Sequence, residues 1–246
     1  IFEAKNIVRA DNKVKGVSLS VRRGEIFGLT GLVGAGRSEL CQAICGVTTY
    51  ESGTVILNGE TVRFTHPLQS MQKKLGYLPE DRQVQGLVLD WSIFRNITLP
   101  SLRKYSTAAG LNSKQERQDG EAFRKKLSIR TKDIDEKVSA LSGGNQQKVV
   151  FAKLLNLDLN VLILDEPTKG VDVGAKSQIY SIMSDLAEQG YAIILISSEM
   201  PEVLAMSDRI GVMHEGSLVK ILDRKEATQE KMLAYAMNSA DTMLKD

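Results

Sequence analysis

Two short motifs in this chain contain the residue types that bind and cleave phosphates. Residues 141–148 read Leu-Ser-Gly-Gly-Asn-Gln-Gln-Lys, and Asp165-Glu166-Pro167 stands downstream. A glycine pair that opens a helix presents backbone N–H groups and a helix dipole to a phosphate. An Asp-Glu pair at the end of an apolar strand can hold Mg²⁺ and orient a water molecule. Together the two motifs indicate nucleotide chemistry.

A third motif runs from Gly31 to Ser38 and fits the phosphate-loop pattern Gly-x-x-x-x-Gly-Lys-Ser/Thr at all but one position. Glycines let the backbone approach phosphate, successive N–H groups form an anion site, and the following helix adds its dipole. Ser38 offers a hydroxyl to Mg²⁺. A glycine turn that serves only strand–helix packing is the alternative. The predicted ATP contacts are Gly31, Leu32, Val33, Gly34, Ala35, Gly36, Arg37, Ser38 and Glu39.

Arg37 occupies the lysine position of that pattern. Lysine is a compact point charge on a thin stem, whereas arginine is a wide planar fork. Arg37 can still bind phosphate in a bidentate manner. It fits less well between the β- and γ-phosphates, where the transition state needs a charge. We therefore expect ATP binding to persist better than ATP hydrolysis.

The composition bounds the class of protein. The chain has 246 residues, 42% of them apolar but only 5% aromatic, and a net charge of +2. This balance gives no electrostatic indication of nucleic-acid binding, and we expect no nucleic-acid partner. The longest aliphatic runs, 161–164 and 192–196, fall far short of the ~18 residues that span a bilayer. No secretory signal pattern is present, so we expect a cytoplasmic domain, and the start at Ile1 is compatible with a piece of a longer chain.

The few thiols and imidazoles do not suggest a metal site. Cys41 and Cys45 lie four residues apart in a predicted helix and share one face of it. Two thiols without another cysteine or a nearby histidine make a poor ligand set, so we expect both in the core. His66 and His214 are isolated, and we expect structural or solvent-exposed roles for them.

Short strands alternate with helices in the first and last thirds of the chain. This alternation predicts a mostly parallel sheet covered by helices. Residues 17–21 and 54–57, with the turn Asn58-Gly59, predict an antiparallel patch beside it. The other predicted elements are strands at 25–30, 161–164 and 192–196, helices at 37–45, 174–189 and 228–243, and a hairpin at 210–222.

The middle of the chain is helix-rich and charged, with a loop-like stretch at 101–113. Three aromatic residues lie near its start, Trp91, Phe94 and Tyr105. A polar helical layer would not need three aromatic side chains. We expect them to pack in a core, and a surface that contacts a partner is the alternative.

On these motifs the chain resembles the ATPase domains of ABC transporters from end to end. Residues 141–145 are similar to the family's signature, 162–166 to its Walker B strand with the catalytic glutamate, and 170–172 to its D-loop. Residues 76–82 occupy the Q-loop region, with Glu80 where glutamine is usual. The resemblance implies an α/β P-loop NTPase fold with a mostly parallel core sheet, an antiparallel β subdomain and a helical subdomain. It implies one cassette over residues 1–246, with its core at 1–90 and 152–246 and its helical part at 91–151.

Four segments narrow the resemblance to the ATP-binding subunits of bacterial simple-sugar importers. They are residues 31–39, 79–82, 143–148 and 197–202. Those subunits carry two cassettes in one polypeptide, and this chain resembles the second, C-terminal one. The implied partners are an N-terminal or other second cassette, transmembrane permease subunits and, indirectly, a sugar-binding protein. The implied location is peripheral, on the cytoplasmic side of the inner membrane.

The resemblance also implies residue roles, because such cassettes bind ATP between the P-loop of one and the signature of the other. Glu166 would polarise the attacking water. Ser38, Glu80 and Asp165 would hold Mg²⁺. The residues that would contact the partner's ATP are Ser142, Gly143, Gly144 and Asn145.

Two departures from the family pattern predict a slow or silent site on this P-loop. Ser198 stands at the switch position, where hydrolysing relatives usually carry histidine, and serine cannot carry a positive charge. Residues 9–14 contain no aromatic side chain to stack on adenine. Losing one preorganised transition-state donor typically costs ~10²–10³ in rate, and Arg37 and Ser198 are two such changes.

Two alternative functions stay open at this point. The first is a fully competent ATPase half, in which Arg37 substitutes adequately for lysine. The second is a soluble ABC protein of DNA repair or translation, although neither a coiled-coil interruption nor basic arms are present in the sequence. The identity of a transported sugar is not encoded here, because the sugar would meet other subunits.

Overall fold

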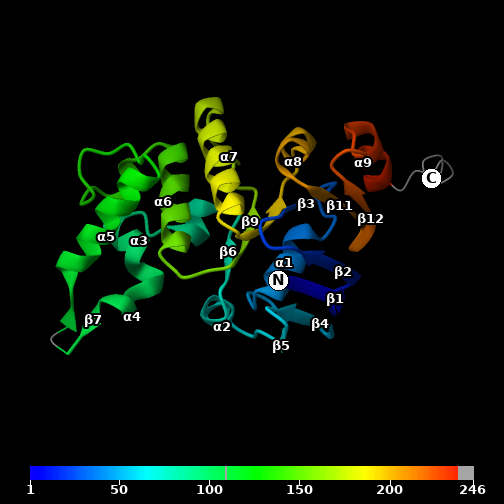
Figure 1. The fold of residues 1–246 in the computed structure, drawn as a ribbon, viewed down its shortest axis with the longest axis horizontal. Helices are drawn as coiled ribbons and strands as arrows, with labels where there is room; N and C mark the ends of the chain where they lie inside the picture. The colour runs from blue at the N-terminus through cyan, green and yellow to red at the C-terminus, as the bar shows by residue number, and fades with distance from the viewer. Residues whose placement is uncertain (109, 238–246) are drawn as a thin grey trace. The chain divides into compact units, whose positions relative to one another are not determined.

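The computed structural model describes residues 1–108 and 110–237, and these form two compact units (Figure 1). The first unit contains residues 1–77, 160–166 and those from 183 onward. The second contains residues 78–159 and 167–182.

The first unit is built on two sheets. An antiparallel four-stranded sheet has the order β2-β1-β4-β5, and a six-stranded sheet has the order β12-β11-β3-β10-β9-β6. The antiparallel strands are β1 (Phe2–Val8), β2 (Lys15–Val21), β4 (Ser52–Leu57) and β5 (Glu60–Val62). The others are β3 (Ile26–Gly31), β6 (Leu75–Leu78), β9 (Val161–Asp165), β10 (Ala192–Ile196), β11 (Arg209–His214) and β12 (Ser217–Asp223).

The parallel register brings the phosphate-binding motifs to one edge of the six-stranded sheet. β10 runs parallel to both β3 and β9, with Ile196 opposite Leu29 on one side and Asp165 on the other. These three strands are buried along their whole length, as expected for parallel strands that are covered on both faces. Loops that leave their carboxyl ends therefore meet, which is where ligands bind in open α/β sheets.

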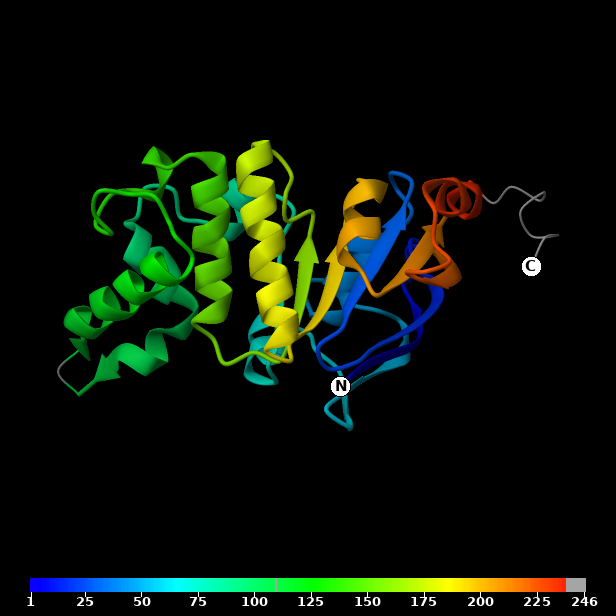
Figure 2. The same cartoon turned by 45° about the horizontal axis from the view of Figure 1, so that its top comes forward.

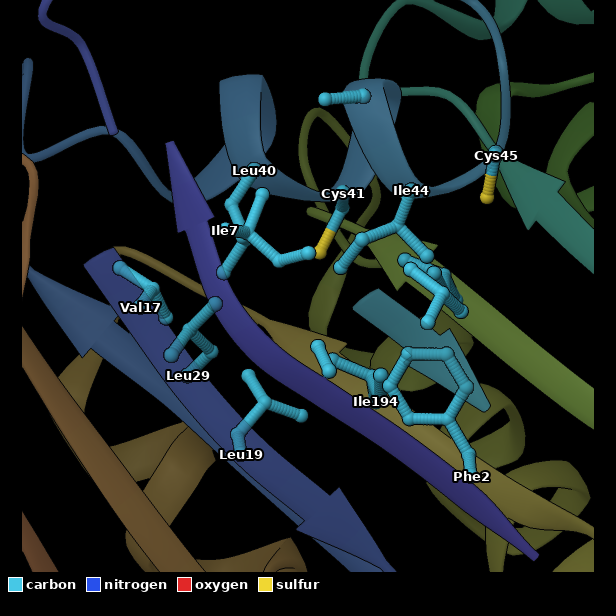
Figure 3. Packing of buried hydrophobic residues seen from close by; sticks show 14 of the residues in the cluster. Phe2, Ile7, Val17, Leu19, Leu29, Leu40, Cys41, Ile44, Cys45 and Ile194 are labelled. Atoms are coloured by element: carbon cyan, nitrogen blue, oxygen red, sulfur yellow. The ribbon is translucent and has the colours of Figure 1, made fainter. Parts of the chain in front are cut away.

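The core of the first unit lies between the two sheets and is mostly aliphatic (Figure 3). Phe2 and Leu19 of the antiparallel sheet pack with Leu40, Cys41 and other residues of α1 (Arg37–Ile44) and with the apolar side chains of β3 and β10. Both cysteines are buried and form no disulfide, which confirms their predicted place in the core.

The remaining helices of the first unit are α2 (Pro67–Gln72), α8 (Met200–Met206) and α9 (Gln229–Ala236). α9 packs with α8 on β11 and β12 through a small apolar cluster (Figure 2). The predicted tail helix at 228–243 is therefore present over 229–236, and residues 238–243 lie outside the described residues. The two histidines have structural contacts: His66 caps α2, and Nδ1 of His214 lies 2.7 Å from the carbonyl oxygen of Ala236.

The second unit is mainly helical. Its elements are η1 (Arg82–Gly86), α3 (Ile93–Thr98), η2 (Leu99–Ser101), α4 (Leu102–Tyr105), β7 (Ser106–Thr107), β8 (Gly110–Leu111), α5 (Ser113–Lys126), η3 (Val138–Ala140) and α6 (Gly143–Leu155). α7 (Val173–Glu188) begins in this unit and ends in the first. The prediction of a loop-like stretch at 101–113 was wrong, because this segment contains α4, β7 and β8. The hydroxyl of Tyr105 donates to Asp119 Oδ2 at 2.8 Å and so anchors α4.

Trp91, Phe94 and Tyr105 do not share one role. Phe94 and Tyr105 are buried, which confirms the expected core packing, whereas Trp91 is 43% exposed. Within residues 1–108 and 110–237, no helix combines the length and apolarity that a membrane span requires.

The buried thiols give a simple test of the core. Cys41 and Cys45 are fully buried, and burial raises the pKa of both thiols. We expect a disulfide reagent at mildly alkaline pH to label neither cysteine in the native protein and both after denaturation. A Leu111→Cys variant, at a position that is 53% exposed, should react at once and serve as the control. Rapid labelling of the native wild-type protein would contradict the core described here.

Candidate functional site

The glycine loop connects β3 to α1, and its backbone geometry requires glycine. Gly34 and Gly36 have φ angles of +82° and +93°, a conformation that other residues rarely adopt. A Cβ at Gly36 would lie 2.2 Å from the carbonyl oxygen of Lys13. Gly36 is also the N-cap of α1, so the loop delivers its amides to the start of a helix. Val33 is 94% exposed, so contacts from this part of the loop to a ligand would come from the backbone.

Arg37 does not extend freely from the loop. Its guanidinium is buried, and Nη1 donates to the backbone carbonyl of Ser197, just after β10, at 2.8 Å. Thr30 Oγ1 donates to the same carbonyl at 3.2 Å. The arginine that replaces the P-loop lysine is thus fixed against the end of the sheet.

Ser38 and Asp165 lie together as the sequence predicts, and Tyr77 joins them. The Ser38 hydroxyl donates to Asp165 Oδ1 at 3.0 Å, and the Tyr77 hydroxyl donates to Asp165 Oδ2 at 2.7 Å. The Asp165 side chain is fully buried, and a buried carboxylate needs such donors. Burial, together with the nearby charge of Asp165, raises the pKa of Tyr77, so its hydroxyl stays a donor.

Glu166 follows directly and has a left-handed backbone, with φ of +49°. Its carboxylate lies next to Ser198, whose backbone N–H donates to Oε1 at 2.7 Å. Burial raises the pKa of Glu166, while the hydrogen bonds from Ser198 and the charge of Arg37 oppose that shift. The predicted water-polarising carboxylate and the predicted switch position are therefore in direct contact.

These oxygens fit Mg²⁺ bound together with a nucleotide. In the described part of the chain, no cluster of three or more His, Cys, Asp or Glu side chains could hold a metal ion alone. Mg²⁺ in nucleotide sites commonly takes one or two carboxylates and completes its shell with phosphate and water. One serine hydroxyl in the first turn of α1 and one carboxylate at the end of β9 match that pattern.

The signature residues lie in the second unit, at the start of α6. Ser142 is the N-cap of that 13-residue helix. Asn145 Nδ2 donates to Ser142 Oγ at 2.9 Å, and Asn145 Oδ1 accepts from the backbone N–H of Arg130 at 2.8 Å. Ser142 and Asn145 thus hold each other in place at the start of α6.

Arg82 holds the backbone of the predicted D-loop region in the same unit. Its Nη1 donates to the carbonyl of Lys169 at 2.7 Å, and Nη2 donates to that of Gly170 at 3.1 Å. The side chain of Lys169 pairs in turn with Glu80. Glu80, predicted as a metal ligand, therefore has an ion-pair partner within the second unit, whereas Ser38 and Asp165 belong to the first.

The glycine pair of the signature also has a packing role. A Cβ at Gly143 would lie 2.7 Å from Arg82 Nη2 and 3.0 Å from the carbonyl oxygen of Gly170. A Cβ at Gly144 would lie 2.4 Å from Cβ of Ala175 in α7. The two glycines let α6 approach the D-loop region and α7 closely.

A pocket opens in front of the signature residues. Arg130 and Lys148 line it and give it positive charge, which suits a phosphate. The Lys148 ammonium donates to the carbonyl of Ser128 at 2.9 Å, and burial together with the charge of Arg130 lowers its pKa. The remaining lining residues are Ser142, Gly144, Asn145, Asp172, Gly174, Ala175 and Gln178.

The segment without an aromatic residue lies beside the P-loop helix. The Arg9 guanidinium is held by Asp11 at 2.7 Å and also contacts the carbonyl of Glu39 at 3.3 Å. Lys13 pairs with the Glu39 carboxylate at 3.2 Å. The side chain of Glu39, a predicted ATP contact, is therefore turned toward this segment.

The roles of Tyr77 and Arg82 are not apparent from the sequence, although both residues lie in the Q-loop region at 76–82. The signal available for Tyr77 was a lone hydroxyl at the end of an apolar strand. For Arg82 it was a charged residue next to Glu80 and Asp81. Neither pattern identifies a partner that lies far away in the chain.

Comparisons with known proteins agree with this geometry. The chain matches the ABC transporter family over residues 14–169. It is 48% identical to the ribose import ATP-binding protein RbsA of Lactococcus lactis subsp. cremoris, over 96% of this chain and 48% of that protein. It is 47% identical to RbsA of Bacillus cereus, over 96% of this chain and 47% of that protein. The chain thus spans about half the length of the curated relatives it matches.

Solved structures are similar in fold. A nucleotide-free ATP-binding cassette from an ABC transporter superposes with a TM-score of 0.82 at 18% identity, covering 99% of this chain and 97% of that one. A dimeric cassette in a post-hydrolysis state with ADP and Pi gives 0.78 at 20% identity, covering 91% and 99%. These matches confirm the predicted α/β P-loop NTPase fold with its antiparallel sheet.

The packing at Gly144 generates a prediction about stability. Gly144→Ala should lower the free energy of unfolding by ~1–3 kcal/mol, because overpacking at a close helix contact forces the neighbours apart. Adding Ala175→Gly should make the double variant more stable than Gly144→Ala alone. Denaturant unfolding of each variant measures both effects.

Gly174→Ala is the matched control for that series. The nearest atom to a Cβ at Gly174 is the side-chain oxygen Asp172 Oδ1, at 3.3 Å, so this change should destabilise the protein far less than Gly144→Ala. An unfolding curve for Gly144→Ala that coincides with that of the wild type would contradict the close packing.

Proposed function

This chain belongs to the ABC transporter family, and we propose that it is one ATP-binding cassette of a two-cassette motor that drives the import of a simple sugar. One observation carries the proposal. The glycine loop from Gly31 leads into the start of α1, where Ser38 bonds to the buried carboxylate of Asp165 at 3.0 Å. Backbone amides at a helix start, beside a hydroxyl and a carboxylate, suit a triphosphate that arrives with Mg²⁺.

The site residues of the first unit each have a defined task in this proposal. The amides of residues 31–38 bind the phosphates. Ser38 and Asp165 hold Mg²⁺, which neutralises charge on the phosphates when bound. Glu166 orients the attacking water and accepts its proton, and the Ser198 N–H at 2.7 Å keeps that carboxylate in place. Glu80, from the Q-loop region, is a further candidate ligand of that metal.

We propose that the site on this P-loop hydrolyses ATP slowly. Arg37 is held by the Ser197 carbonyl at 2.8 Å, which supports a guanidinium that does not reach between the β- and γ-phosphates. The signature residues Ser142, Gly143, Gly144 and Asn145 would instead serve ATP on the partner cassette. The positive pocket in front of them supports that role.

We infer the partners and the transported sugar from the names of the relatives. RbsA proteins are named for ribose import, and the chain covers about half of their length. We propose that this chain is the C-terminal cassette, that the companion cassette belongs to the same polypeptide, and that residues 91–151 form its helical subdomain. Permease subunits and, indirectly, a sugar-binding protein complete the importer, with the cassette peripheral on the cytoplasmic side of the membrane.

A fully competent ATPase half is the second candidate, because Asp165 and Glu166 are both in place. The two candidates differ in one experiment. In the two-cassette protein, Arg37→Lys combined with Ser198→His should raise steady ATP turnover, since it restores two transition-state donors that are each worth ~10²–10³ in rate. A high wild-type turnover that these changes lower would contradict the slow-site proposal. Glu166→Gln is the control, and it should abolish any gain.

The signature can be tested separately, with sugar uptake as the readout. Ser142→Arg places a bulky cation in front of α6 and should reduce ATP turnover of the two-cassette protein and uptake of labelled ribose by ~10²-fold or more. Binding of MgATP to this chain's own P-loop should not change. Ser139→Arg, at an exposed position nearby in η3, is the matched control. Uptake that tolerates Ser142→Arg would contradict the transport role.

A further inference from the structure

We propose that Tyr77 is a positioning residue that orients the Asp165 carboxylate for Mg²⁺. This inference rests on the proposed function, because it concerns the metal that would accompany ATP. It assigns a task to a side chain of β6 for which the sequence motifs predict no role. Its evidence is the hydrogen-bond geometry around one buried carboxylate.

Each oxygen of that carboxylate has its own donor. Oδ2 accepts from the Tyr77 hydroxyl at 2.7 Å, and Oδ1 accepts from the Ser38 hydroxyl at 3.0 Å. Donors on both oxygens fix the rotation of the carboxylate plane about its own bond. Because Asp165 is fully buried, solvent does not compete for these positions.

The direction of the Tyr77 hydrogen bond is also determined. Gln42 Nε2, on α1, lies 3.5 Å from the Tyr77 oxygen and faces it as a weak donor. An amide N–H cannot accept a hydrogen bond, so the phenolic hydrogen is left to point at Asp165. The Tyr77 ring packs against the aliphatic core of the first unit, which holds the hydroxyl where it is.

The consequence appears when Mg²⁺ enters. Ser38, which donates to Oδ1 of Asp165 in this structure, would offer its hydroxyl oxygen to a bound Mg²⁺. The Tyr77 hydroxyl would continue to donate to Oδ2 and would so keep the carboxylate in its present orientation. Outer-shell partners of this kind typically contribute ~10–100-fold in metal affinity.

Tyr77→Phe tests this role, since it removes the hydroxyl and keeps the ring. Calorimetric titrations of ATP are run on the wild type and the variant, with a chelator and at increasing Mg²⁺. We expect ATP affinity without metal to be unchanged and the Mg²⁺ concentration for half-maximal enhancement to rise ~10-fold or more. Tyr105→Phe is the matched control, because that buried hydroxyl bonds to Asp119 in the second unit, and its Mg²⁺ dependence should match the wild type.

The other outcomes separate the two claims. An unchanged Mg²⁺ dependence in folded Tyr77→Phe overturns the positioning role and leaves the proposed function standing. An equal loss of ATP affinity with and without Mg²⁺ marks a merely structural role and also overturns it. If the wild type takes up no ATP under any condition, the proposed function fails first. Tyr77→Met, which also lacks the hydroxyl but keeps an apolar side chain against the core, should shift the Mg²⁺ dependence in the same direction and serves if Tyr77→Phe does not fold.

Discussion

The buried carboxylate of Asp165 connects several segments of the first unit. Asp165 ends β9 without exposure to solvent, and a buried charge is costly unless donors surround it. Two of its donors come from other segments, Ser38 in the first turn of α1 and Tyr77 in β6. The parallel register that sets Ile196 opposite Asp165 also brings Ser197 and Ser198 to the same edge. The sheet therefore fixes the arrangement of the loops.

Close backbone approach is important in the second unit. Gly143 and Gly144 leave no room for a Cβ against the D-loop region and α7. Arg82 then joins segments far apart in the sequence by bonding to the carbonyls of Lys169 and Gly170. The same glycines that could present amides to a phosphate are thus required by packing. The packing and phosphate-binding interpretations of a glycine pair are compatible here.

Much of the fold could be predicted because its signals are local. The buried strands β9 and β10, the glycine loop and the Asn58-Gly59 turn are each recognisable within a few residues. β1 was not, because Asn6 has a φ of +50° and the register of β1 shifts between Ala4 and Ile7, which interrupts the alternation. The roles of Tyr77 and Arg82 could not be predicted either. Tyr77 is 88 residues away from Asp165 in the sequence, and Arg82 is 88 residues away from Gly170. Only the folded chain brings these pairs together.

The proposed motor role requires that backbone amides between Gly31 and Ser38 bind a nucleotide. The most direct measurement is a calorimetric titration of MgATP into well-folded protein with the companion cassette present, repeated with Asp165→Ala. The account predicts saturable uptake by the wild-type protein and weaker uptake, specifically in the presence of Mg²⁺, by the variant. A wild-type protein that takes up no nucleotide, or an Asp165→Ala variant that binds MgATP as well as the wild type, would contradict it.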